Sequence, residues 1–255
     1  MNRVLDTAAP LALIAILLAI WEAACRLTGV PAYFLPPPSA VVAAMVENRP
    51  LLLGSAWNTL TTALLALVAA SLLASSLAMI IATNRLLEKA VRPLAVALQV
   101  TPVVAIAPQV VIWAGLAHAD RAIIALAVIV AFFPIFSGAL TGLKATDPDL
   151  ERLFDLYGAS RWQKLSRLRL PSAIPYMLEG HKVAGGLAVI GAVVAEFVAG
   201  SGGSQGLAWR ILESSNRLQT AKTFAAVIVL SIMGAGLNAA LQTAETVILK
   251  RFRGR

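Results

Sequence analysis

Long apolar runs, separated by short charged stretches, set the pattern of this 255-residue chain. Several runs exceed the roughly 18 apolar residues that a helix needs to cross a bilayer. The pattern predicts an all-α, polytopic membrane protein with about six transmembrane helices. Because these helices must pack on one another, a single domain is expected over residues 1–255. The spans are expected at about residues 10–27, 58–83, 93–115, 122–143, 176–199 and 223–249.

The connections between the spans carry signals of their own. Residues 28–57 are expected to form a loop with a short interfacial helix after a run of three prolines, and Asn58 or Thr59 is expected to cap the second span. Residues 84–92 predict a short basic turn. Residues 201–222 predict an amphipathic helix in an outer loop, whose polar face holds Arg210, Glu213 and Arg217.

Two short patterns predict specific contacts within the spans. Glu22 and Arg26 are four residues apart near the end of the first span, a spacing that lets them pair. Gly138 and Gly142 form a GxxxG pair, which permits close contact between helices.

The third span is unusual because it contains Pro102 and Pro108. Each proline removes a backbone hydrogen bond, and in lipid such breaks are tolerated only where protein or a water-filled cavity satisfies the freed groups. This span is therefore expected in the interior. The candidates for a substrate path are polar residues of this span and one intramembrane acid: Gln99, Thr101, Gln109 and Glu196. An alternative role for the first three is to satisfy the broken backbone, and for Glu196 an interhelical or interfacial contact.

Charge and composition narrow the class of protein. The chain is 59% hydrophobic and 13% charged, with a net charge of +8. Most of its Lys and Arg residues fall on one side of the predicted spans, which is typical of cytoplasmic loops. This bias predicts that both termini lie in the cytoplasm. It also explains the positive charge without a nucleic-acid partner. Cys25 is the single cysteine, and the two histidines lie far apart, so no metal-ligand spacing is found.

The charged stretch 144–175, between the fourth and fifth spans, predicts two cytoplasmic helices. Asp147 or Asp149 is expected to cap the first, and Gly158 to end it in a left-handed conformation. Ser160 is expected to cap the second, which prolines at 171 and 175 should end. From the residues alone, this stretch either docks in a protein groove or lies on anionic lipid.

A resemblance separates these two alternatives. Gly158 is followed by nine residues, then Leu168, one further residue, and Leu170-Pro171. This spacing is similar to that of the "EAA" loop in the membrane subunits of bacterial ABC importers. This chain departs from the motif at its head, where Arg152-Leu153-Phe154 replaces Glu-Ala-Ala. Three further segments resemble the nitrate, sulfonate, taurine and pyrimidine branch, and the last of them resembles members that take up pyrimidines, thiamine precursors or riboflavin: 34–41, 101–108 and 188–197.

The resemblance implies a type I importer permease fold and a small organic or anionic solute, delivered by a binding protein to a bacterial inner-membrane complex. It further implies a second permease copy and two cytoplasmic ATPases that bind ATP and Mg. This chain has no Walker A motif, so hydrolysis is expected on the partner and no cofactor on this chain. The residues expected to contact the ATPase are Glu151, Leu153, Phe154, Leu156, Tyr157, Gly158, Ala159, Ser160, Arg161 and Trp162.

The rival function is a self-contained secondary transporter or channel. Repeated halves are typical of many secondary transporters, and the sequence shows none. It also contains no H-E-x-x-H motif that would indicate an intramembrane metalloprotease.

Overall fold

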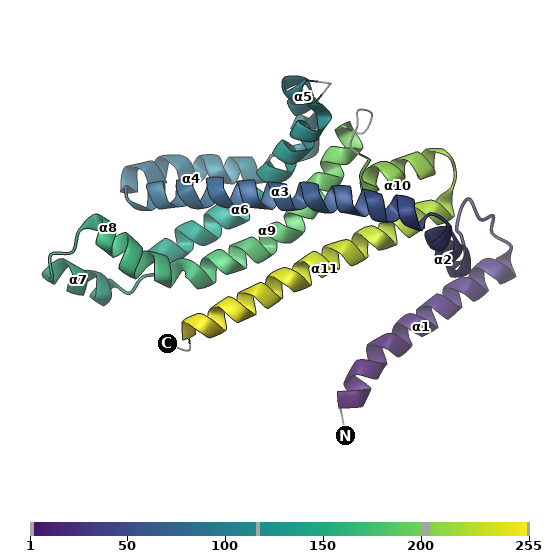
Figure 1. The fold of residues 1–255 in the computed structure, drawn as a ribbon, viewed down its shortest axis with the longest axis horizontal. Coiled ribbons are helices and arrows are strands. Elements are labelled where there is room, and N and C mark those ends of the chain that lie inside the picture. Colours follow the sequence, from purple (N-terminus) through teal and green to yellow (C-terminus); the bar gives the residue numbers. More distant parts are fainter. Residues whose placement is uncertain (1–2, 116–117, 200–204, 254–255) are drawn as a thin grey trace. The chain divides into compact units, whose positions relative to one another are not determined.

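The computed structural model describes residues 3–115, 118–199 and 205–253, and within these ranges it consists of helices joined by turns and loops, without strands. Figure 1 shows the order of the helices. Four of them are long and apolar enough to cross a membrane: Arg49–Ala82, Ala119–Lys144, Arg161–Ala199 and Thr220–Phe252. The helices are α1 (Arg3–Thr28), α2 (Pro38–Glu47), α3 (Arg49–Ala82), α4 (Arg85–Val100), α5 (Val103–Ala114), α6 (Ala119–Lys144), α7 (Pro148–Leu156), α8 (Arg161–Lys164), the π-helical turn η2 (Leu165–Arg169), α9 (Leu170–Ala199), α10 (Leu207–Asn216) and α11 (Thr220–Arg253).

The chain forms two compact units. The first comprises Met1–Trp57 and Gln205–Ser231, and the second comprises Asn58–Ser204 and Ile232–Arg255. Both α3 and α11 contribute residues to each unit. The second unit holds the candidate functional residues.

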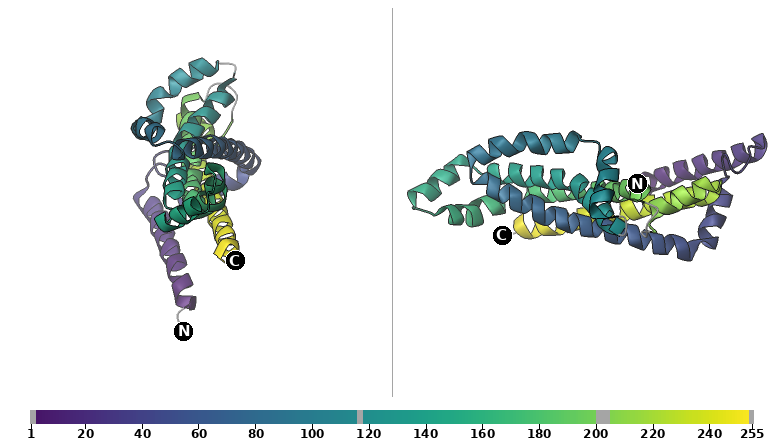
Figure 2. Two further views of the ribbon diagram at one scale, coloured as in Figure 1. Left: turned by 90° about the vertical axis from the view of Figure 1, so that its left-hand side faces the viewer. Right: turned by 90° about the horizontal axis from the view of Figure 1, so that it is seen from above.

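The core of the second unit is the pair α6 and α9, which lie side by side (Figures 1 and 2). Small residues allow the two backbones to touch. A Cβ atom on Gly138 would lie 2.7 Å from the carbonyl oxygen of Tyr176, and one on Gly142 would lie 2.8 Å from the Tyr176 Cβ. On the opposing helix, a Cβ atom on Gly180 would lie 2.6 Å from the carbonyl oxygen of Pro134. The predicted close contact at the GxxxG pair is therefore confirmed.

Buried alanines extend this core toward α5. Ala107 of α5, Ile123 and Leu126 of α6, and Ala195 and Ala199 of α9 form one buried cluster. Since lipid is as apolar as leucine, helices in a membrane gain little from hydrophobicity and associate through close packing instead. The small side chains of the alanines in this cluster provide that packing.

The first unit confirms the predicted pair at the end of α1. Arg26 Nη2 lies 2.6 Å from Glu22 Oε1. The same carboxylate accepts hydrogen bonds from the backbone N–H of Ser39, at 3.0 Å, and from its hydroxyl group, at 2.7 Å. Because Ser39 lies in the first turn of α2, Glu22 joins α1 to the N-terminal end of that helix.

The amphipathic helix predicted after the fifth span is α10, but Arg210 does not lie on an exposed polar face. Its side chain is buried, with Nε donating to the Ser55 hydroxyl at 3.1 Å and Nη1 lying 2.8 Å from Glu213 Oε2. The hydrogen bond from Arg210 holds the pKa of Glu213 below its usual value, and the charges of Arg210, Arg217 and Lys222 act in the same direction. A buried arginine is tolerated here because its donors are paired.

Two helix starts differ from the sequence expectation. The short helix α2 was expected, but α3 begins at Arg49 rather than near residue 58, so Asn58 and Thr59 lie inside the helix and cap nothing. The expected basic turn over 84–92 is the first part of α4, because the Asn84 side chain accepts a hydrogen bond from Leu86 N–H and starts a helix there.

Prolines break the chain at one place and not at another. The third span is divided at Thr101 and Pro102 into α4 and α5, in line with the expected disturbance. In contrast, Pro171 and Pro175 do not end the second cytoplasmic helix, because the helical path continues from Arg161 to Ala199. The π turn η2 precedes Pro171. Its wider hydrogen-bonding pattern lets the helix continue past proline, which has no N–H to donate.

Candidate coupling surface and intramembrane cavities

The segment α7–α8 forms a compact helical hairpin at the end of the second unit where α9 begins (Figures 1 and 2). Asp147 caps α7 by accepting a hydrogen bond from Asp149 N–H. Gly158 has φ +67°, the left-handed conformation expected for it, and lets the chain reverse. Ser160 and Gln163 form a complete capping box at the start of α8. All three sequence predictions for these turns are therefore confirmed.

Large apolar side chains project from this hairpin into open space. Leu156 and Tyr157 are each 84% exposed and Trp162 is 70% exposed, while none of the nine residues of α7, all of them described, is buried. A pocket of about 280 Å³ opens between the two helices, lined by Leu153, Phe154, Tyr157, Ala159, Gln163 and Arg167. We call the ten residues named for ATPase contact, from Glu151 to Trp162, the coupling surface. Its members thus lie on one hairpin whose helices are capped and whose largest apolar side chains are exposed.

The acids of the hairpin are engaged inside the chain. Glu151 pairs with Arg169, with Nε donating to Oε1 at 2.8 Å, and Asp155 pairs with Lys164. These two acids flank Arg152-Leu153-Phe154, the segment that stands in place of Glu-Ala-Ala. Glu151 therefore differs from Tyr157 and Trp162 within the coupling surface, because its carboxylate is directed toward η2.

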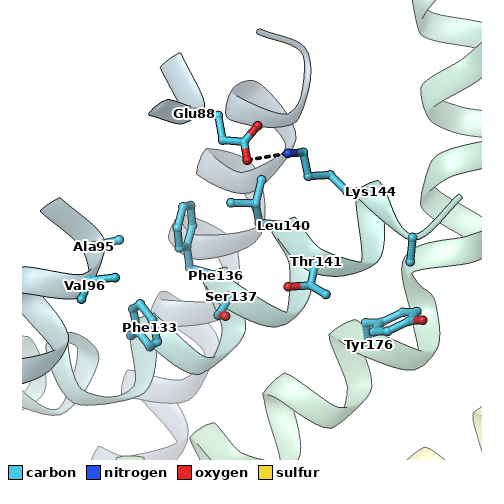
Figure 3. Close-up of a pocket in the computed structure, with 11 residues that line it drawn as sticks. Glu88, Ala95, Val96, Phe133, Phe136, Ser137, Leu140, Thr141, Lys144 and Tyr176 are labelled. Atoms are coloured by element: carbon cyan, nitrogen blue, oxygen red, sulfur yellow. Dashed lines mark hydrogen bonds and ion pairs between the residues drawn. The ribbon is translucent and has the colours of Figure 1, made fainter. Parts of the chain in front are cut away.

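A cavity of about 480 Å³ opens between α4, α6 and α9, and its lining is drawn in Figure 3. The ring side chains of Phe133, Phe136 and Tyr176 and the hydroxyl groups of Ser137 and Thr141 contribute to its wall. At one end, Lys144 of α6 donates to the carboxylate of Glu88 of α4. The cavity therefore combines an aromatic wall with a few hydroxyl groups and one ion pair.

Two smaller cavities of about 250 and 390 Å³ adjoin this region. Phe133 lines all three, and Gln99 lines the two smaller ones. Tyr176 and Thr141 are shared by the first and the third. Together the cavities form a row along α4, α6 and α9 that could hold a small solute.

The four residues named for a substrate path lie in different settings. Gln99 lines the cavities. Thr101 donates its hydroxyl proton to the Ala97 carbonyl at 2.8 Å, and Gln109 is exposed on α5. Glu196 is completely buried and accepts a hydrogen bond of 2.8 Å from the Thr59 hydroxyl, so it joins α9 to α3.

Sequence reasoning missed the hydroxyl-bearing residues of the cavity wall, Ser137, Thr141 and Tyr176. Ser137 and Thr141 are four residues apart on α6, and this polar stripe in an apolar span was a usable signal. Tyr176 lies where the sequence suggested only the beginning of the fifth span. The contribution of Glu88 and Lys144 could not be anticipated, because they are 56 residues apart.

Comparisons with known proteins agree with this arrangement. A family model described as "Binding-protein-dependent transport system inner membrane component" matches residues 70–254. The formylaminopyrimidine transport permease protein ThiX of Halalkalibacterium halodurans is 33% identical over 250 residues, which are 98% of each chain. The riboflavin transport system permease protein RibX of Chloroflexus aurantiacus is 31% identical over 198 residues, 72% of this chain and 69% of that one.

A more distant relative and a solved structure complete the comparison. The putative aliphatic sulfonates transport permease protein SsuC of Bacillus subtilis is 28% identical over 92% of this chain and 84% of its own length. The crystal structure of an amino acid ABC transporter with histidines matches with a TM-score of 0.64 over 82% of this chain and 97% of that one. Because the identity is only 16%, this likeness shows the fold alone, which is that of a type I importer permease. The chain therefore belongs to the family of binding-protein-dependent transport system inner membrane components.

Proposed function

We propose that this chain is the translocating subunit of an ATP-driven importer whose coupling surface docks in a separate ATPase. The single observation that carries the docking is the exposure of Leu156, Tyr157 and Trp162 on a hairpin stabilised by a capping box. Exposed aromatic side chains on a rigid helix are typical anchors for a groove on a partner protein. Two ATPases, a second permease copy and a binding protein complete the complex.

The cavity row along α4, α6 and α9 is the proposed translocation path. The ring side chains of Phe133, Phe136 and Tyr176 suit a planar heterocycle, since aromatic rings favour offset stacking and edge contacts. The hydroxyl groups of Ser137 and Thr141 and the amide of Gln99 supply hydrogen bonds for its edge. The similarity to a formylaminopyrimidine permease over 98% of the chain supports the same solute class, ahead of riboflavin, a sulfonate or nitrate.

The orientation belongs to the same proposal. With the coupling surface in the cytoplasm, the bias of Lys and Arg residues places both termini on the same side. A protease added to the outside of intact cells should then leave a C-terminal tag uncut and should cut it in inverted vesicles. Cleavage of the tag in intact cells would contradict this orientation.

Docking is tested with Tyr157→Asp, which places a charge on the exposed anchor. Because Tyr157 is 84% exposed, the variant should fold as the parent does but lose its co-purifying ATPase. Asp149→Asn is the matched control on α7, since this exposed acid lies outside the coupling surface. Full retention of the ATPase by Tyr157→Asp would count against docking.

Transport is tested in vesicles that contain the complex and its binding protein. Labelled formylaminopyrimidine should accumulate only with ATP, and an excess of taurine or nitrate should not compete. Accumulation driven by an ion gradient without ATP would favour the rival, a self-contained secondary transporter. Uptake of taurine or nitrate in preference to the heterocycle would overturn the solute class while leaving the docking intact.

A further inference from the structure

Arg169 joins the cytoplasmic hairpin to the end of a long helix. Its Nε donates to Glu151 Oε1 of α7 at 2.8 Å, and its Nη1 donates to the carbonyl oxygen of Ala82 at 3.4 Å. Ala82 is the last residue of α3. One guanidinium therefore contacts both α7 and α3, two helices that lie 69 residues apart along the chain (82 to 151).

The contact at Ala82 forms part of the cap of α3. The last carbonyl groups of a helix have no partner inside it. Here the Ile80 carbonyl accepts from Thr83 N–H at 3.3 Å and from the Thr83 hydroxyl at 2.7 Å, and the Ile81 carbonyl accepts from Asn84 N–H at 3.1 Å. The Ala82 carbonyl accepts from Arg169. A cation at this end also complements the negative end of the helix dipole.

The position of Arg169 depends on the π turn η2. Within this turn Leu165 and Leu168 are buried, so the turn is anchored in the second unit, while Arg169, its last residue, reaches α7 and α3. Such turns occur mostly as single insertions in α-helices and often at functional sites. The planar guanidinium has donors pointing in several fixed directions, which allows two simultaneous contacts that the single ammonium of lysine makes poorly.

We propose that Arg169 is a positioning residue that makes α7 and the C-terminal end of α3 move as one body when the partner ATPase closes. The proposal rests on the docking proposed above. It explains why Glu151, at the edge of the coupling surface, is paired internally rather than exposed like Tyr157. Movement of the hairpin would then reach the membrane through α3 as well as through the direct continuation into α9.

The test measures the distance between spin labels on Ile80→Cys, in the last turn of α3, and Asp149→Cys, in the first turn of α7, in a Cys25→Ser background. Both positions are exposed. The complex is purified with its ATPase and examined without nucleotide and after trapping with ATP and vanadate. With Arg169 present, the distance distribution should be the same in both states. In Arg169→Gln the distance distribution should shift between the two nucleotide states by more than the width of the distribution.

Further variants separate the two contacts. Glu151→Gln should reproduce the shift, because it weakens the contact with α7 and leaves Ala82 untouched. The exchange Glu151→Arg with Arg169→Glu restores an ion pair to α7 but puts a carboxylate against the carbonyl end of α3, so the shift should persist. Lys164→Gln is the matched control, since Lys164 pairs with Asp155 of α7 and, among the described residues, no ion pair joins it to α3; the distances in this variant should stay constant.

Three outcomes of the distance measurements would overturn the proposal. They are a distance that already shifts with Arg169 present, a distance that stays constant in Arg169→Gln, and full restoration by the charge exchange. Failure of docking is recognised separately, because then no ATPase co-purifies with the unmodified chain. Loss of the ATPase from Arg169→Gln alone would also overturn the proposal, since it would make Arg169 part of the docking contact.

Discussion

The α6–α9 interface and the coupling surface are both apolar, but they use side chains of opposite size. At the interface, Gly180 leaves so little room that an added Cβ atom would lie 2.6 Å from the Pro134 carbonyl oxygen. On the hairpin, Tyr157 and Trp162 are mostly exposed. The first region is complete within this chain, whereas the second has its largest side chains without cover.

The difference reflects the solvent of each region. In lipid, helices associate through shape and close packing, which small residues provide. In water, exposed aromatic residues grouped on a rigid hairpin mark a surface that another protein covers. An apolar residue therefore indicates packing or docking according to its size and its surroundings, and hydropathy alone does not separate the two.

The largest expected effect comes from filling the interface. Gly180→Leu should prevent α6 and α9 from closing, because the new side chain meets backbone that cannot move aside, and overpacking of this kind costs about 1–3 kcal/mol or more. Thermal unfolding of the purified chain in detergent should show a large loss of stability. Gly186→Ala on the same helix is the control, since no described atom lies within 4 Å of its Cβ position. Equal stability of the two variants would contradict the close packing that distinguishes the α6–α9 interface from the coupling surface.

Removing an anchor of the coupling surface should have the converse outcome. Trp162→Ser should leave the unfolding temperature of the isolated chain nearly unchanged, since the side chain is 70% exposed. If Trp162 is a central anchor, affinity for the ATPase should fall at least about 30-fold, corresponding to about 2 kcal/mol. Titrating the ATPase against the chain held in nanodiscs measures this affinity. A large loss of stability with unchanged affinity would assign Trp162 to packing.

Loss of the cap at α8 should give an intermediate effect. Ser160→Ala removes the side chain that accepts from Gln163 N–H, which costs about 1 kcal/mol and should weaken ATPase binding about fivefold. Hydrogen exchange of the α8 amides should accelerate by a similar factor. Ser166→Ala is the control, because the Ser166 hydroxyl donates to the Trp162 carbonyl within the same helical path and caps nothing. Equal exchange rates in both variants would contradict the role of the cap.

Acidification should produce the smallest effect and should touch neither region. The pKa of Glu213 is lowered in the folded chain by the hydrogen bond from Arg210, relative to an ordinary value of 4.5. Its contribution to stability is therefore complete above about pH 4.5 and is lost as the pH falls through the lowered pKa. Thermal unfolding between pH 6 and about 3 should show a decline that is smaller in Glu213→Gln. An identical decline in both proteins would exclude Glu213 as its source.

The sequence predicts the elements that depend on local chemistry. The left-handed Gly158, the Ser160 cap and the GxxxG contact of Gly138 and Gly142 all follow from residue types at short spacing. Helix starts were less accessible, because hydropathy marks where the apolar run begins and not where the backbone turns helical, as at Arg49.

Long-range contacts account for what the sequence does not show. The pairs Glu88–Lys144, Thr59–Glu196 and Glu151–Arg169 join positions far apart in the chain, and no local pattern identifies them. The effect of Pro171 was likewise mistaken, since only the structure reveals the π turn before it. A lone proline signal therefore predicts a disturbance of the helix and not its end.

The uninterrupted helical path from Arg161 to Ala199 has a mechanical consequence. Its 39 residues correspond to a rod of about 58 Å at 1.5 Å per residue. Trp162 lies at the α8 tip of this rod, Tyr176 lies beside the cavity and Glu196 lies near its far end. A tilt of roughly 5° about the far end would displace the tip by about 5 Å, and the cavity wall by proportionately less. On the docking proposed above, the rod acts as a lever arm, in which a wide stroke at the ATPase becomes a shorter, more forceful movement at the solute.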